Sequence, residues 1–167
     1  MDNVLFGSVS DLAQAIRNKS VSSVEVVQSY LDRIEEVNPA LNAVVQLCPE
    51  TALGQAAEAD DALARNELRG PLHGVPMTLK DSFDTAGVVS TWGTPGRAEF
   101  APEEDATVVA RLKAAGAILL GKTNTPEFTL DFETDNPIYG RTNNPYDLTR
   151  TSGGSSGGAA AAIASGC

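Results

Sequence analysis

The sequence is short of cysteine and histidine, and both shortages limit the chemistry open to it. Its 167 residues include two cysteines, Cys48 and Cys167, and a single histidine, His73. Two cysteines supply neither a disulfide framework nor a metal-binding cluster, so the composition fits a reducing cytoplasm. We therefore expect a cytoplasmic protein that uses no metal and no cofactor.

Positive charge is scarce as well. Lysine and arginine together number 12 against 22 acidic residues, which gives a formal net charge of -10. This charge repels phosphate groups, so we expect no direct nucleic-acid partner and no binding to an anionic membrane surface. No apolar run approaches the ~20 residues that cross a bilayer. The acidic start, MDNVLFGSVSD, does not have the form of a signal peptide.

The first half of the sequence has the patterns of helices around one short strand. Hydrophobic residues make up 42% of the chain, which is enough for a buried core in one domain. Residues 8–37 predict two helices, the second with capping-box spacing at Ser22 and Glu25 and with Pro39 after its end. A strand at 42–47 and an alanine-rich helix at 50–68 follow.

The second half alternates strands and helices, which predicts a layered α/β fold. The expected elements are a strand at 75–80 that ends at Lys80, a helix at 106–116, a buried strand at 117–121, and a helix beginning in TPEFTLDF, residues 125–132.

Two motifs match well-known signatures but lack the surroundings that those signatures need. Residues 116–123, GAILLGKT, match the phosphate loop, yet the residues between the glycines predict a strand and not a phosphate-binding bend. Residues 153–158, GGSSGG, match the nucleophile elbow G-x-S-x-G, which requires a preceding strand and a later histidine. The preceding segment is turn-like, and His73 lies upstream, where we expect a structural or solvated residue. We predict neither a nucleotide site nor a Ser-His-Asp triad.

A lysine can replace histidine as the base that activates a serine, provided that burial keeps its amine neutral. Lys80 is the candidate because it ends an apolar strand. Together with Ser155 or Ser156 it would form a Ser–Lys variant of the triad. A solvated lysine and a flexible glycine–serine linker are the alternatives.

Several motifs in order resemble the N-terminal part of the amidase signature enzymes. They are GVPMTLKD at 74–81, DATVVARLKAAGAILLGKTNTPEF at 105–128, and NPIYGRTNNPYDLTRTSGGSSGG at 136–158. The resemblance implies an α/β fold with a mixed β-sheet flanked by helices, here an incomplete sheet. Residues 1–167 would be the N-terminal part of a single domain, with a largely helical entry region at 1–67 and the start of the catalytic core at 68–167.

The resemblance also implies a Ser–cis-Ser–Lys triad that cleaves amides through an acyl-serine intermediate. Lys80 corresponds to the base and Ser155 to the middle serine of the proton relay. Ser156 corresponds to a neighbour that holds the lysine by a hydrogen bond, and the Gly154–Ser155 peptide is expected to be cis. We expect Lys80 to be buried, with its amine within hydrogen-bond reach of Ser155 or Ser156. Thr129 matches a position that lines the substrate pocket in relatives; an ordinary helix-surface threonine is the alternative.

The family's nucleophilic serine and oxyanion-hole amides belong to a second glycine-rich stretch of the type GSDTGGS. No such stretch occurs in residues 1–167. The nucleophile is therefore expected beyond residue 167, and residues 1–167 alone are expected to be inactive.

The resemblance leaves two functions open within the family. The TPEF that follows GKTN looks like the hydrolases, whereas the glutamine-hydrolysing subunit of the tRNA-dependent amidotransferase more often has an MDEF-like sequence there. We favour an amidase that hydrolyses a small-molecule amide, and the amidotransferase subunit is the alternative. A noncatalytic fragment or binding module is the alternative of another class, and a homodimer is left open.

Overall fold

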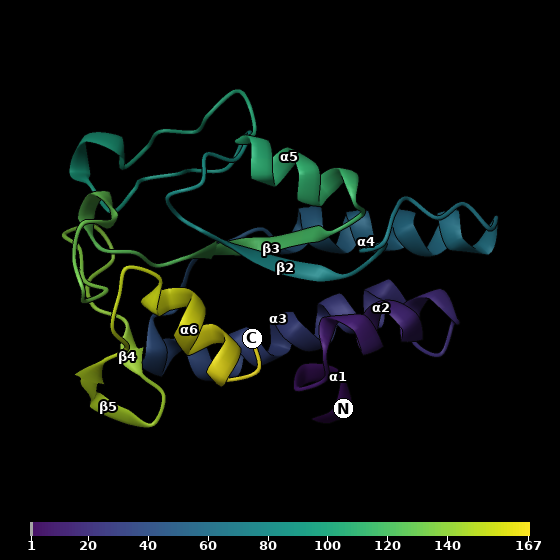
Figure 1. Ribbon diagram of the computed structural model, residues 1–167, viewed down its shortest axis with the longest axis horizontal. Coiled ribbons are helices and arrows are strands. Elements are labelled where there is room, and N and C mark those ends of the chain that lie inside the picture. The colour runs from purple at the N-terminus through teal and green to yellow at the C-terminus, as the bar shows by residue number, and fades with distance from the viewer. Residues whose placement is uncertain (1) are drawn as a thin grey trace.

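A small mixed sheet separates two sets of helices, with α5 on one side and α3 and α6 on the other (Figure 1). The structure is a computed structural model and describes residues 2–167. In chain order its elements are α1 (Asp2–Leu5), α2 (Val9–Arg17), α3 (Ser23–Leu41), β1 (Val44–Leu47), α4 (Pro49–Ala64), β2 (Pro76–Lys80), η1 (Pro95–Arg97), α5 (Thr107–Ala114), β3 (Ile118–Thr123), η2 (Glu127–Thr129), β4 (Asn143–Asn144), β5 (Asp147–Thr151) and α6 (Gly157–Ala164).

The sheet has the strand order β1-β3-β2, so β3 lies in the middle. β3 pairs antiparallel with β1 and parallel with β2, and all six of its residues are buried. A strand covered on both faces needs no alternation of polar and apolar residues, which explains the run AILL. The prediction of an α/β fold with a mixed sheet and flanking helices is confirmed.

A bulge in β3 decides which side chains face which helices. Leu119 pairs with Met77 and Gly121 pairs with Thr78, so Leu120 has no partner in β2. An extra residue of this kind reverses the faces of the residues that follow it. Lys122 consequently lies beside Leu79, and Thr123 lies beside Lys80.

Each face of the sheet has its own apolar core. On one face Ile118 and Leu120 pack with the buried side chains of α3, α4 and α6, among them Ile34 and Ala161. On the other face Leu79 and Leu119 pack against Val109 of α5. Each large aliphatic side chain that is fully buried contributes about 1.5–3 kcal/mol, so these two cores hold β2 and β3 rigidly between the helices.

The two helices within residues 8–37 are confirmed, but the second extends further than predicted. Ser22 and Glu25 form the expected capping box. Pro39 lies inside α3, which ends at Leu41. A proline in the last turn removes a single backbone hydrogen bond. Asn38 caps the end of the helix, since its Oδ1 accepts from the Ala43 and Val44 N–H groups at 2.8 Å each.

The predicted helix at 125–132 is wrong. The segment contains only the short turn η2, in which Phe128 and Thr129 have positive φ values of 51° and 62°. The Phe128 N–H donates to the Trp92 carbonyl at 2.8 Å, a partner outside any helix of this segment. The stretch before GGSSGG also differs from the expected turn, because β4 and β5 form an antiparallel hairpin there.

Candidate active site

Lys80 is the last residue of β2, and its side chain points away from the α5 face. Its strand neighbour is Thr123, one residue beyond the buried Lys122. The Asp81 N–H donates to the Thr123 carbonyl at 2.9 Å, so the pairing continues past Lys80. The backbone at Lys80 is therefore held by strand pairing with β3, which continues on to Asp81.

The glycine–serine stretch forms a tight loop at the start of α6. Gly153 has a left-handed φ of 81°, and the Gly154–Ser155 peptide bond is cis, as expected. Ser155 is half-buried and Ser156 is exposed. The linker interpretation is wrong, because the loop is packed against neighbouring segments instead of joining two separate units.

The structure brings Lys80 and both serines together. The Lys80 amine lies 2.8 Å from Ser155 Oγ and 3.1 Å from Ser156 Oγ. Partial burial lowers the pKa of Lys80 below its ordinary value, which raises the neutral fraction at any given pH. The expectation that Lys80 is buried is met only in part, since the residue is half-buried. The exposed Ser156 leaves one side of the site open to solvent.

A buried polar network holds the serine loop in place, and sequence reasoning did not identify it. Thr125 Oγ1 donates to the Ser155 carbonyl at 3.2 Å. Thr134 Oγ1 accepts from the Gly157 N–H at 2.9 Å. Asn124 ties Thr125 to the rest of the segment, because its side chain bonds the Thr125 N–H, Asn136, the Gly140 carbonyl and Thr142.

The two glycines after the serines are required by close packing. A Cβ at Gly157 would meet the side chains of Thr134 and Ser152, and a Cβ at Gly158 would meet the backbone of Asn124. Any larger residue would push α6, and with it the serines, away from β3. The pattern GGSSGG thus combines two serine hydroxyls with a helix start that can approach the Asn124 backbone.

The remaining predicted residues lie outside this cluster. Thr129 is half-exposed in the short 3-10 turn η2, and both its substrate contact and the alternative of a surface threonine stay predictions. His73 is buried and structural: its Nε2 lies 3.0 Å from the Ala59 carbonyl, and its Nδ1 accepts from the Arg69 N–H at 3.0 Å. GAILLGKT contains β3, which confirms that it is not a phosphate loop.

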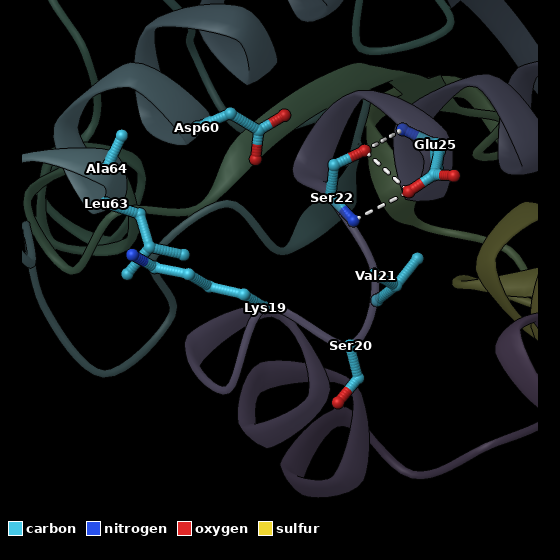
Figure 2. A pocket seen from close by; sticks show the side chains of 8 residues that line it. All are labelled: Lys19, Ser20, Val21, Ser22, Glu25, Asp60, Leu63 and Ala64. Atoms are coloured by element: carbon cyan, nitrogen blue, oxygen red, sulfur yellow. Dashed lines mark hydrogen bonds between the residues drawn. The ribbon is translucent and has the colours of Figure 1, made fainter.

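The pocket in Figure 2 lies apart from Lys80 and the serine loop. It encloses about 270 Å³ between the α2–α3 turn and α4, and its lining includes neither Lys80 nor the serines. Three of its polar residues take part in helix capping: Ser22 and Glu25 bond each other, and Asp60 accepts from the Ser23 N–H at 2.7 Å. These three side chains therefore stabilise the start of α3.

Within residues 2–167, no cluster of three or more histidine, cysteine, aspartate and glutamate side chains is arranged to hold a metal ion. None of the helices in the same range has the length and apolar character required to cross a membrane.

Comparison with known proteins gives a consistent set of relatives. The chain is 43% identical over 159 residues to a glutamyl-tRNA(Gln) amidotransferase subunit of Alkaliphilus metalliredigens (strain QYMF), covering 95% of this chain and 32% of that protein. It is 48% identical over 159 residues to indoleacetamide hydrolase of Bradyrhizobium diazoefficiens, covering 95% of this chain and 30% of that protein. A solved fatty acid amide hydrolase superposes with a TM-score of 0.89 at 28% identity, covering 94% of this chain and 28% of that one.

The chain spans about a third of the length of the curated relatives that it matches. The family model Amidase matches residues 25–167, from the first turns of α3 through α6. The match includes β2, the serine loop and the network between them. On this evidence the chain belongs to the amidase signature family.

Proposed function

We propose that the protein containing these residues is an amidase, which hydrolyses the C–N bond of a carboxylic amide through an acyl-serine intermediate. The observation that carries the proposal is the Lys80 amine at 2.8 Å from Ser155 Oγ and 3.1 Å from Ser156 Oγ. A lysine with a pKa lowered by burial, in contact with two serines, is suited to general-base catalysis.

In the proposed mechanism the neutral Lys80 amine accepts the Ser155 hydroxyl proton while Ser155 accepts a proton from the nucleophilic serine. The nucleophile forms a bond to the amide carbonyl carbon. The relay then returns the proton to the leaving nitrogen, and the C–N bond breaks. Water, activated by the same relay, hydrolyses the acyl-serine ester. Ser156 accepts a hydrogen bond from the Lys80 amine and thereby keeps the lone pair of the amine nitrogen directed toward Ser155.

The nucleophile and the oxyanion-hole amides belong to the part of the family's domain outside residues 1–167. We therefore propose that residues 1–167 are the N-terminal part of one catalytic domain and that the protein works in the cytoplasm without a cofactor. Its partner is a small-molecule amide, with Thr129 at the substrate pocket. A homodimer remains compatible with this assignment.

The second candidate is the amidotransferase subunit, which sequence identity supports almost as well. Identity to the amidotransferase protein of Alkaliphilus metalliredigens, 43%, is close to the 48% found with the indoleacetamide hydrolase. In favour of the hydrolase is the TPEF sequence at residues 125–128. The two candidates share the Lys80–Ser155 relay and differ in whether the released ammonia is passed to another protein of a complex.

The test compares wild-type protein, Lys80→Ala and the matched control Lys19→Ala, in which an exposed lysine is truncated instead. Each is assayed on an aryl amide alone and on glutamine with the partner subunits. We expect Lys80→Ala to lower kcat by about 10²–10⁴-fold while Lys19→Ala remains near wild type. Turnover of the aryl amide supports the hydrolase, and turnover of glutamine only with partner subunits supports the amidotransferase. Near-normal turnover by Lys80→Ala would remove the lysine from the mechanism.

A further inference from the structure

Lys122 is a buried lysine that the proposed mechanism does not use. Its side chain is 0% exposed in β3, and the bulge in that strand turns it to the face opposite Lys80. Burying an ammonium group is costly unless hydrogen bonds and opposite charges compensate for it. The groups that compensate for Lys122 therefore indicate what it stabilises.

All three acceptors of Lys122 lie in the segment that follows Lys80 in the chain. Its Nζ donates to the Phe83 carbonyl at 2.7 Å, to Ser90 Oγ at 2.7 Å and to Thr85 Oγ1 at 3.3 Å. An ammonium group has three N–H donors, so each of them is used. Lys122 thus ties residues 83–90 to the central strand.

Phe83 connects this anchor to Lys80 directly. The Phe83 N–H donates to the Lys80 carbonyl at 2.9 Å and closes the turn after β2. The carbonyl of the same residue accepts from Lys122. A continuous path therefore runs from the Lys122 ammonium through Phe83 to the Lys80 backbone, and from the Lys80 amine to Ser155.

Charged groups lie around Lys122 and affect its protonation. Asp81 is fully buried, and its Oδ2 accepts from the Thr91 N–H at 3.0 Å and from Thr91 Oγ1 at 2.5 Å. Burial lowers the pKa of Lys122 to about 8, while Asp81, Asp84 and Cys48 raise it and Arg97 lowers it. At neutral pH Lys122 is therefore a cation with a full set of donors.

We propose that Lys122 is a positioning residue for the relay: by holding the Phe83 carbonyl and the Ser90 hydroxyl, it fixes the turn after β2 so that the Lys80 amine stays against Ser155 and Ser156. The proposal rests on the proposed function for its kinetic consequence. Its structural consequence, the environment of the Lys80 amine, can be measured without any substrate.

The kinetic test uses Lys122→Met, which keeps the side-chain length but removes the donors and the charge, and Ser90→Ala, which removes one acceptor without changing any charge. For each variant kcat and KM are measured on an amide and corrected for the folded fraction by circular dichroism. We expect kcat to fall about tenfold or more in Lys122→Met and by a smaller factor in Ser90→Ala, with KM within about twofold of wild type. The double variant Lys122→Met/Ser90→Ala should have a kcat no lower than that of Lys122→Met, because both substitutions break the same connection between Lys122 and the turn.

The substrate-free test follows the Lys80 Cε resonance by NMR as pH is raised, in protein labelled with ¹³C-lysine. If the turn loosens, the Lys80 amine becomes more hydrated, and its pKa moves toward the ordinary lysine value. We expect this upward movement in Ser90→Ala, where loss of the Lys122 charge cannot cause it. The acid limb of the kcat profile should move in the same direction.

The outcomes separate the inference from the proposed function. The inference is overturned if Lys122→Met has the wild-type kcat per folded molecule. If Lys122→Met does not fold, the same result in Ser90→Ala overturns it. In both cases the Lys80 mechanism is left intact. An unchanged Lys80 pKa in Ser90→Ala overturns it as well. A wild-type protein without Lys80-dependent turnover refutes the proposed function, and the NMR titration then decides the positioning role by itself.

Discussion

The buried ammonium of Lys122 should make the stability of the protein depend on pH in a specific direction. In the unfolded chain the lysine pKa is the ordinary 10.5, and in the folded protein it is about 8. Between these two values the unfolded state binds more protons than the folded state. The free energy of unfolding must therefore rise as pH increases through this window. Below pH 8 both states carry the proton, so the burial penalty is present in full.

The magnitude follows from the separation of the two pKa values. It corresponds to a gain of ~3 kcal/mol across the window, most of it between about pH 8 and pH 10.5. Lys122→Met lacks this titration. The difference in unfolding free energy between wild type and Lys122→Met should thus shift by ~3 kcal/mol in favour of wild type over this range. Groups whose pKa is the same in both proteins cancel in the difference. Lys80 does not cancel if its pKa moves toward the ordinary value in Lys122→Met, and its contribution then has the same sign as that of Lys122.

The assay is urea unfolding at a series of pH values from 7 to 11. Trp92 is the single tryptophan and reports on the segment that Lys122 anchors: its Nε1 donates to Asp84 at 2.9 Å, and the Arg97 guanidinium lies 3.9 Å from its ring centroid. Parallel stability curves for the two proteins would refute the reasoning, because they would show that Lys122 has the same pKa folded and unfolded. A difference that shrinks with pH would show that the folded pKa is raised instead.

Three further predictions concern the candidate site. Because burial lowers the pKa of Lys80, kcat should decline as pH falls through a limb centred below 10.5, and that limb should be lost in Lys80→Ala; a limb at the ordinary lysine value would contradict a half-buried base. Gly158→Ala should destabilise the protein by about 2 kcal/mol or more in a urea titration, since its Cβ meets the Asn124 backbone, whereas Gly54→Ala in α4, with open space around it, should be neutral or stabilising by up to ~1 kcal/mol. A polypeptide of residues 1–167, once shown to be folded, should release no ammonia or amine from a panel of amides; turnover that disappears with Lys80→Ala would identify Ser155 or Ser156 as a nucleophile.

The sequence was sufficient to predict the elements whose signals are local. The capping box at Ser22 and Glu25 marks the start of α3, and the uniformly apolar AILL marks a strand covered on both faces. The pairing of Lys80 with Ser155 and Ser156 came from chemical inventory and family resemblance together, since a base was needed and His73 lay in the wrong place. No local pattern placed these residues together across 75 positions of sequence.

The errors have a common physical cause, which is that side chains distant in sequence decided the local backbone. TPEFTLDF has the composition of a helix start, but the Trp92 carbonyl takes the Phe128 N–H, and Asn124 and Asn136 bind the Thr125 backbone. Those partners compete with helix formation and are not visible within the segment. The threonines that hold the serine loop were missed for the same reason: Thr125 and Thr134 look like ordinary polar loop residues until α6 packs against them.

Lys122 shows how far a strand pattern can mislead when a bulge is present. Strict alternation along ILLGKT would place Lys122 on the same face as Ile118 and Leu120, among the apolar side chains of α3, α4 and α6. The unpaired Leu120 reverses that assignment and directs Lys122 to the Phe83 carbonyl instead. The same reversal puts Thr123 beside Lys80, on the face where Ser155 lies 2.8 Å from the amine. One extra residue in β3 therefore separates the two lysines, so that Lys122 is bonded to the turn after β2 while the half-exposed Lys80 faces Ser155.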